Sequence, residues 1–224
     1  KVLITDQHGL QTSYSATTLS TGKAKLKNAK FERNEDEITL SPEFALVNKD
    51  GTQLNQNAGF VTIHYKLNYE SEWKSKDFTA GDTTPIKIYI PGGNVQLNYY
   101  QTTDSHDIDS SGTKEELIQG ENKLYVTNED TDEAYMGGSA DHPASLTKVR
   151  DYLIGKTEEW EISLKKGNYE ATEDDMTSDR ENSQSIKTLL VFSGPSKVTI
   201  KAPSDTERAI LNAKSYGRLI TTKT

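Results

Sequence analysis

The clearest chemical motif in the sequence is a run of alternating oxygen-bearing side chains, Asp107-Ile108-Asp109-Ser110-Ser111-Gly112. Oxygen ligands at the first, third and fifth positions, with a glycine at the sixth for a sharp turn, are typical of the start of a calcium-binding loop. The Thr113 carbonyl and the carboxylates of Glu115 and Glu116 are candidates to complete the shell of oxygen ligands. The position of the bidentate glutamate of an EF-hand holds Ile118. The sequence therefore predicts a calcium site that is not an EF-hand, with a solvated acidic loop as the alternative.

The charge of the chain is concentrated around that motif. The net charge is −8, and the stretch 101–135 contains ten carboxylates against only Lys114 and Lys123, while the residues on either side of it balance. Carboxylates this close in sequence repel one another unless solvent or a cation screens them. An acidic chain also lacks the basic face that binds a phosphate backbone, so no nucleic-acid partner is expected.

Three aromatic side chains are candidates for a second kind of site. Trp73 lies in a polar segment, between Glu72 and Lys74, and Tyr99 and Tyr100 are adjacent in sequence. Exposed aromatic rings can stack on the faces of sugar rings, which makes Trp73, Tyr99 and Tyr100 candidate ligand-binding residues for surface glycans. The alternative is a half-buried tryptophan whose ring covers the edge of a sheet.

No pattern in the sequence indicates an active site. The chain has no cysteine, which excludes disulfides, thiolate metal sites and cysteine nucleophiles. Gly155-Lys156-Thr157 resembles the end of a phosphate-binding loop, but Arg150 stands where that loop requires its first glycine. Ser145 and Lys148 have the spacing of serine acylases without the companion motifs. We therefore expect that the protein is not an enzyme.

Alternation of apolar and polar residues dominates the chain and predicts β-strands. In the clearest case, the apolar residues that share one face are Val61, Ile63, Tyr65, Leu67 and Tyr69. His64 and Lys66 then fall on the opposite, solvent-facing side. Turn residues at 91–94 and 193–196 predict two hairpins, one pairing 86–90 with 95–99 and the other pairing 186–192 with 198–200. About ten strands joined by short turns favour an all-β fold, an antiparallel β-sandwich or jelly roll.

One short helix is predicted near 143–154, capped by Asp141 and ended by Gly155. Long acidic loops are expected at 101–121, 128–142 and 168–185. The whole chain, 1–224, is predicted to be a single β-sandwich domain, and the loop 101–121 is the place for a sub-boundary. The stretch 204–217 fits either a helix or a hairpin. No apolar run approaches the ~18 residues of a membrane-spanning helix, so no span is expected.

The strand pattern also bears on assembly. Lysines at positions 23, 25 and 27 alternate along a predicted strand, as on an exposed sheet edge. Together with the short strand predicted at 2–5, they suggest that a terminal segment pairs with a neighbouring copy. The composition is similar to that of secreted or surface β domains of bacteria, archaea and viruses. We expect a non-enzymatic, extracellular structural subunit of an appendage, filament, surface layer or virion, assembling with copies of itself through β-strand contacts. The alternative is a carbohydrate-binding or adhesin module.

Overall fold

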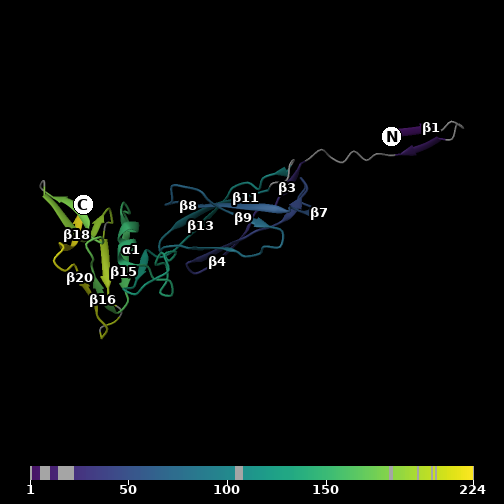
Figure 1. The fold of residues 1–224 in the computed structure, drawn as a ribbon. Coiled ribbons are helices and arrows are strands. Elements are labelled where there is room, and N and C mark those ends of the chain that lie inside the picture. The colour runs from purple at the N-terminus through teal and green to yellow at the C-terminus, as the bar shows by residue number, and fades with distance from the viewer. Residues whose placement is uncertain are drawn as a thin grey trace.

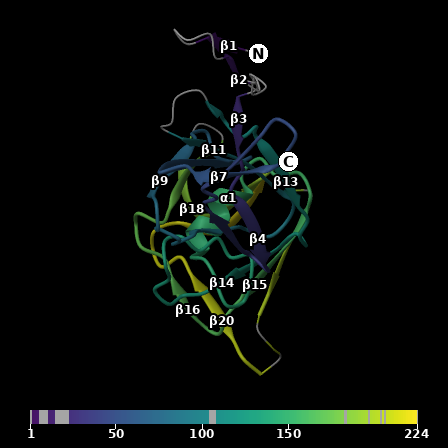
Figure 2. The ribbon, with the colours of Figure 1, turned by 90° about the vertical axis from the view of Figure 1, so that its right-hand side faces the viewer.

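The computed structural model describes residues 2–5, 11–14, 23–103, 108–181, 184–195, 197–202, 204 and 206–223. Strands account for 50% of the protein and helix for 4%, which confirms the all-β prediction. The molecule is elongated, with two lobes one after the other and the first two strands at the end far from the C-terminal lobe (Figure 1). Figure 2 looks along this long axis, so the two lobes overlap in it. Within the described ranges, no helix is long and apolar enough to cross a membrane.

The first two strands form a sheet of their own. β1 (Val2–Thr5) pairs antiparallel with β2 (Gln11–Tyr14). The segment that was expected to pair with a neighbouring copy therefore has a partner within the chain. A lone two-stranded hairpin is marginally stable in water. The contact between this hairpin and a second copy stays a prediction.

The N-terminal lobe is built from mostly antiparallel strands around one core. Its strands are β3 (Ala24–Leu26), β4 (Lys30–Asn34), β5 (Glu37–Ser41), β6 (Ala45–Val47), β7 (Gln53–Asn57), β8 (Phe60–Leu67), β9 (Lys74–Thr79), β10 (Ile86–Tyr89), β11 (Val95–Thr103), β12 (Ile108–Asp109) and β13 (Lys114–Ile118). They form three sheets, with the strand orders β10-β5-β4, β13-β11-β8-β9 and β12-β3-β6-β7. β3 has a neighbour on each side, so the alternating lysines around it do not mark a free sheet edge, contrary to the expectation.

The register of β8 is the one that its alternation predicts. The residues of this strand and the turn after it that are buried in the core or packed against it are Val61, Ile63, Tyr65, Leu67 and Tyr69. His64 points to the opposite face, where its Nε2 lies 3.1 Å from Thr102 Oγ1. On the same face, Lys66 Nζ donates to the Ser71 carbonyl at 2.8 Å. A slip of one residue would invert this whole arrangement, so the prediction is confirmed.

The turn at 91–94 does not close a hairpin, contrary to the prediction. β10 pairs with β5 in one sheet, whereas β11 pairs with β8 and β13 in another. Ile88 of β10 and Leu97 of β11 are nevertheless buried in the same core. The turn therefore carries the chain from one sheet to the sheet facing it, because two packed sheets share their apolar faces.

The C-terminal lobe is built mainly from parallel strands. Its elements are β14 (Lys123–Val126), α1 (Leu146–Leu153), β15 (Glu159–Leu164), β16 (Gly167–Glu170), β17 (Thr177–Glu181), β18 (Gln184–Ser193), β19 (Lys197–Lys201), β20 (Ala209–Asn212) and β21 (Arg218–Lys223). The parallel pairs are β14·β15, β15·β19, β16·β20 and β18·β21. β17 and β18 pair antiparallel.

This order of pairing defines a parallel β-solenoid of three coils. Coil 1 contains β14 and α1, coil 2 contains β15, β16 and β18, and coil 3 contains β19, β20 and β21. In such an architecture each repeat buries its apolar face against the next repeat. The hairpin predicted between 186–192 and 198–200 was therefore wrong, because β18 and β19 belong to consecutive coils. The described residues 204 and 206–217 form neither a helix nor a hairpin with 198–200, since β20 among them pairs with β16.

α1 packs against β18 and lies within the predicted range. Arg150 Nη1 donates to the Leu189 carbonyl of β18 at 3.2 Å. The N-cap is Ser145, whose Oγ accepts from the Lys148 N–H at 3.3 Å, and not the predicted Asp141. The apolar residues that the helix buries are Leu146, Val149 and Leu153.

The buried apolar residues form two clusters, one in each lobe. The first extends from Leu26 to Ile118 and the second from Leu124 to Ala213. The change from one to the other falls between Ile118 and Leu124, where the loop named above as a sub-boundary ends. The prediction of a single domain thus depends on whether the two cores unfold together.

Candidate functional site

Coil 3 is the last layer of the solenoid and one side of it is uncovered. β19, β20 and β21 are each the terminal strand of their sheet, so in the described part of the chain none of them has a strand on the side away from coil 2. The opposite side of the solenoid faces the N-terminal lobe, where the Tyr152 ring of α1 meets the Tyr69 ring edge-on at 5.5 Å. Coil 3 therefore lies at the end of the molecule away from the N-terminal lobe (Figure 1).

Equivalent inward positions are more exposed in coil 3 than in coil 2. Trp160 and Ile162 of coil 2 are at most 4% exposed. Val198 and Ile200 of coil 3 stand beside them in the parallel ladder, yet they are only partly buried. Leu211 of β20 is likewise only partly buried. Coil 2 is covered by coil 3, whereas no strand of the described residues covers coil 3 on its other side.

Coil 3 also exposes large apolar side chains. Within the described residues, six large apolar side chains are exposed, and three of them, Ile210 (55%), Ile220 (43%) and Tyr216 (38%), lie in coil 3. A group of exposed apolar residues on a protein surface indicates an interaction site.

Ion pairs connect the coils along the outer surface. Lys123 Nζ of coil 1 lies 3.2 Å from Glu161 Oε1 of coil 2, and Lys201 Nζ of coil 3 lies 2.5 Å from Glu161 Oε2. The hydrogen bonds from Lys201 and then from Lys123 lower the pKa of the Glu161 carboxyl. Along this row the charge alternates from coil to coil, and β19 of coil 3 presents the positive sign; a looser pair elsewhere, Lys166 with Glu207 at 3.9 Å, has the opposite sign.

Two further pairs follow the same rule. Lys197 Nζ of coil 3 lies 3.6 Å from Glu159 Oε2 of coil 2, and Lys214 Nζ lies 3.0 Å from Glu170 Oε2. In both pairs the lysine belongs to coil 3 and the glutamate to coil 2. A layer placed on coil 3 would continue the alternation if it carried carboxylates.

A row of aromatic rings lies on the solvent face of the sheet β13-β11-β8-β9. Trp73 is 46% exposed and meets the Tyr100 ring edge-on at 5.2 Å, and Tyr100 stacks on His64 at 4.6 Å. Tyr99 points into the core, where it is 4% exposed and stacks on Phe31. The structure thus brings Trp73 and Tyr100 together and separates Tyr99 from them, because adjacent residues of a strand face opposite sides. Sequence reasoning missed His64, although the alternation of β8 places it on this face.

The residues predicted to start a calcium loop are described only in part. Asp107 lies outside the described residues. Asp109 and Thr113 are exposed. Ser111 is 7% exposed, and its hydroxyl donates to the Gln101 carbonyl at 2.6 Å and accepts from the Gln101 N–H at 2.7 Å. This serine therefore fastens the loop to β11.

The two glutamates proposed to complete the calcium shell lie on opposite faces of β13. Glu115 Oε2 accepts from Gln96 Nε2 at 3.2 Å on the solvent face. Glu116 lies near the Tyr99 hydroxyl, and the burial of that phenol, followed by the charge of Glu116, raises the pKa of Tyr99. Among the described side chains, no three His, Cys, Asp or Glu residues are grouped closely enough to hold a metal ion. Calcium binding at this loop stays a prediction.

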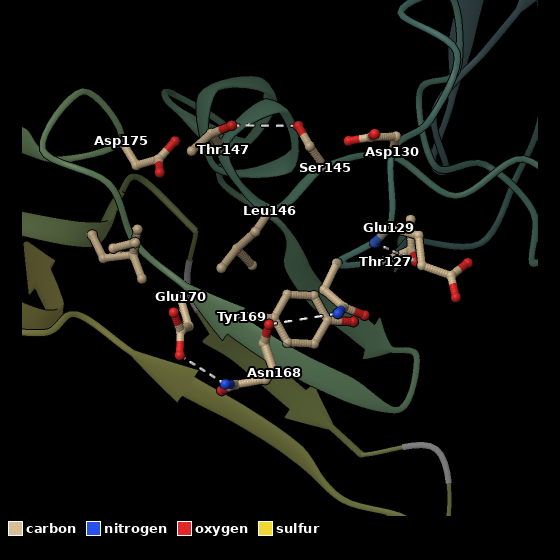
Figure 3. Close-up of a pocket in the computed structure, with 13 residues that line it drawn as sticks. Thr127, Glu129, Asp130, Ser145, Leu146, Thr147, Asn168, Tyr169, Glu170 and Asp175 are labelled. Atoms are coloured by element: carbon tan, nitrogen blue, oxygen red, sulfur yellow. Dashed lines mark hydrogen bonds between the residues drawn. The ribbon is translucent and has the colours of Figure 1, made fainter.

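A cavity of about 490 Å³ opens beside the start of α1 (Figure 3). The carboxylates that line it belong to Glu129, Asp130, Glu170 and Asp175. Tyr169 lies at its base and donates from its hydroxyl to the carbonyls of Val126 (3.0 Å) and Lys165 (2.8 Å). Burial raises the pKa of Tyr169 to about 12. The phenol thus holds two backbone segments together, and the acidic lining disfavours an anionic ligand.

The lobes meet through tightly packed backbone. A Cβ atom on Gly92 would come within 1.9 Å of the Lys123 carbonyl oxygen, and one on Gly138 within 2.2 Å of the Ile90 carbonyl oxygen. Both glycines line a cavity of about 670 Å³ at this junction. Any larger residue at these positions would push the two backbones apart.

A polar contact also crosses the junction. His142 Nδ1, in the segment before α1, lies 3.0 Å from Oδ1 of Asp36, which is 4% exposed in the turn between β4 and β5. The rings of Tyr89 and Tyr135 pack against the His142 ring at 4.6 and 4.8 Å. This contact fixes the segment before α1 on the N-terminal lobe.

Comparison with known proteins gives little further information. No protein-family model matches the sequence, and no curated protein matches it. Among solved structures, a Bacillus anthracis protein proposed to be a polysaccharide deacetylase aligns with 63% of this chain and 52% of its own, at 10% identity and a TM-score of 0.28. A polysaccharide deacetylase from Bacillus cereus aligns with 65% of this chain and 51% of its own, at 11% identity and the same TM-score. The chain therefore matches about half the length of each of these proteins, and the similarity is too low to indicate a shared fold.

Proposed function

We propose that this protein is a non-enzymatic structural module of an extracellular or surface assembly, joined to other copies through β-strand contacts. The observation that supports the proposal is the uncovered third coil, with three strand edges and the half-buried Val198 and Ile200 on one end of the molecule. Edges of this kind pair with added strands unless the protein blocks them. Burial of apolar surface supplies the free energy of such a contact, at about 25 cal/mol per Å².

Sedimentation velocity of the purified chain over a range of concentrations tests this proposal, with electron microscopy to identify polymers. Ile210→Lys should abolish association, because it places a charge on the uncovered coil. The matched control is Ile154→Lys, since Ile154 is 59% exposed and Ile210 is 55% exposed, but Ile154 lies beside α1. A wild-type chain that stays monomeric up to millimolar concentration would refute the proposal.

The aromatic row supports a second candidate function, glycan binding. Trp73 is exposed and Tyr100 and His64 extend the aromatic surface beside it. Aromatic rings of this kind combine an apolar face with a polar edge, as sugar rings do. A glycan array would identify a ligand, and Trp73→Ala should abolish that binding. Tyr99→Phe is the control, because Tyr99 faces the core; loss of binding in both variants would argue against the aromatic row as the site.

A further inference from the structure

The uncovered coil sets requirements for whatever covers it. Lys197 and Lys201 lie on the outer side of β19, and each already pairs with a glutamate of coil 2 on one flank. Their other flank faces the open side of the coil. A strand placed there must offer main-chain groups to the β19 edge, carboxylates near the two lysines, and apolar surface beside Val198 and Ile200.

Strands at the sheet edges of this chain meet these requirements to different degrees. β9 carries Lys74 and Lys76, which the lysines of β19 would repel. β7 carries no charge at all. β13 is the terminal strand of its sheet, holds Glu115 on the solvent face and carries two glutamates against one lysine, Lys114.

β13 also has the apolar residue that such a contact needs. Leu117 is on the same face as Glu115 and is 66% exposed, more than any other large apolar residue that the structure describes. β13 and β19 are both five residues long. The strand belongs to the stretch 101–135, which carries the excess negative charge of the chain, so its surroundings attract a basic surface.

We propose that β19 of one molecule pairs edge to edge with β13 of a second copy of this chain. This inference rests on the proposed function, because it names the partner of the strand contact. The sheet β14-β15-β19 would then continue into the sheet β13-β11-β8-β9 of the second copy. Glu115 of that copy lies beside Lys197 and Lys201, and Leu117 covers apolar surface at the end of the coil. Adding a strand to an exposed edge is a common mode of recognition.

The two surfaces are different, so the contact is head-to-tail. β19 lies at the end of the C-terminal lobe, and β13 lies in the N-terminal lobe (Figure 1). A contact between two unlike surfaces leaves one of each free in every oligomer and generates open filaments unless a ring closes. This property separates the inference from a symmetric dimer through two copies of coil 3.

Charge reversal in the full chain tests the inference by sedimentation velocity. One variant combines Glu115→Lys with Leu117→Lys, and the other combines Lys197→Glu with Lys201→Glu. Each variant alone should be monomeric, with the dissociation constant raised by roughly tenfold or more, since like charges facing one another oppose association. An equimolar mixture restores two contacts, one native and one with the charges exchanged, and should assemble into oligomers in which the two variants alternate. A chain carrying all four changes should assemble again, because the charges are exchanged.

Controls keep a negative result interpretable. Glu32→Lys makes the same charge change as Glu115→Lys at an exposed position on β4, a terminal strand of another sheet, and should leave association unchanged. If the reversed lysines unfold coil 3, as Trp160 fluorescence would reveal, the single change Lys197→Glu replaces that variant in the mixture, because the Lys197 side chain is 63% exposed. Normal assembly of the Glu115/Leu117 variant, or a mixture that stays monomeric, overturns this inference while the wild-type chain still assembles. A monomeric wild-type chain overturns the proposed function itself.

Discussion

The two lobes bury their apolar residues in opposite ways. In the N-terminal lobe, antiparallel sheets surround one core, and β8 and β11 are covered on their inner face by other strands of the same lobe. In the C-terminal lobe, each coil covers the one before it, so the last coil stays half-exposed. The first arrangement encloses its own core. In the second, the stability is approximately the sum of contributions from single layers and from the contacts between neighbouring layers. The described C-terminal lobe therefore leaves an apolar layer partly uncovered, whereas the core of the N-terminal lobe is enclosed by its own strands.

The largest expected effect on stability comes from truncating one buried side chain in either core. Phe78 and Ile162 are both fully buried, one in each lobe. Phe78→Ala should destabilise the N-terminal lobe by about 3–5 kcal/mol, and Ile162→Ala should destabilise the C-terminal lobe by about 2–5 kcal/mol. If the lobes are independent, each change shifts one unfolding transition and leaves the other in place.

The two tryptophans make this measurement possible, because Trp73 lies in the N-terminal lobe and Trp160 in the C-terminal core. A Trp73→Phe background reports on the C-terminal lobe, and a Trp160→Phe background reports on the N-terminal lobe, in denaturant titrations followed by fluorescence. A single transition that moves with both core changes would show instead that the chain unfolds as one domain, as the sequence predicts.

The next largest effect should come from a substitution at the junction between the two lobes. Gly92→Ala forces a Cβ against the Lys123 carbonyl and should cost about 1–3 kcal/mol, as overpacking does. Because Gly92 belongs to one lobe and Lys123 to the other, both tryptophan reporters should register the loss. Gly112→Ala is the matched control, since a Cβ there meets open space. Equal effects of the two changes would contradict the close approach at the junction.

A calcium site in the N-terminal lobe would have a moderate effect on that lobe alone. Calcium at about ten times its dissociation constant should stabilise the lobe by about 1.4 kcal/mol, by mass action. Calorimetry with and without millimolar calcium measures this, and Asp107→Asn with Asp109→Asn should remove it. Asp130→Asn with Asp174→Asn sheds the same charge elsewhere and should not. If sodium chloride at matched ionic strength gives the same rise in Tm, charge screening explains it and there is no site.

The smallest expected effect concerns the charge alternation of the solenoid. The pKa of Glu161 is lowered by Lys201 and Lys123 in the folded protein. The stabilisation by this carboxylate is therefore complete above its ordinary pKa of 4.5 and is lost as pH falls through the lowered folded value. Glu161→Gln should flatten the pH dependence of unfolding in this range, as followed by Trp160.

Glu159→Gln serves as the comparison for that measurement, because the Glu159 carboxylate is 69% exposed and 3.6 Å from Lys197. Exposed ion pairs are weak and screened by salt. Glu159→Gln should therefore leave the loss of stability at acid pH as it is in the wild type. If the wild type and both variants lose stability identically as the pH falls, these two ion pairs contribute nothing measurable to holding the coils together.

Sequence patterns predicted which face of a strand is buried better than they predicted which strands pair. The alternation in β8 correctly assigned Ile63 to the core and His64 to the solvent, because a strand has only two faces. The same rule, applied to β11, assigns Tyr99 and Tyr100 to opposite faces, so the sequence already held the signal that separates them. The pairing of β15 with β19 had no local signal, because parallel neighbours lie a whole coil apart in sequence.

The two wrong hairpins have the same cause. Turn residues at 91–94 and 193–196 show that the chain changes direction, but they do not show whether the next strand stays in the same sheet. In a hairpin the next strand returns beside the first, whereas here it moves to another sheet or another coil. The helix was found because its buried face has a local period, but its cap, Ser145, was missed in favour of the more distant Asp141.

The position of α1 also determines the order in which the layers of the solenoid are synthesised. α1 lies in coil 1 and precedes coils 2 and 3 in the chain, and domains and repeats fold as they leave the ribosome. The closed end is therefore synthesised first, and every later coil has a finished layer to fold on. Coil 3 is made after the layer on which it folds. A nascent chain consequently cannot form the β19 edge until the N-terminal lobe and the first two coils have been translated.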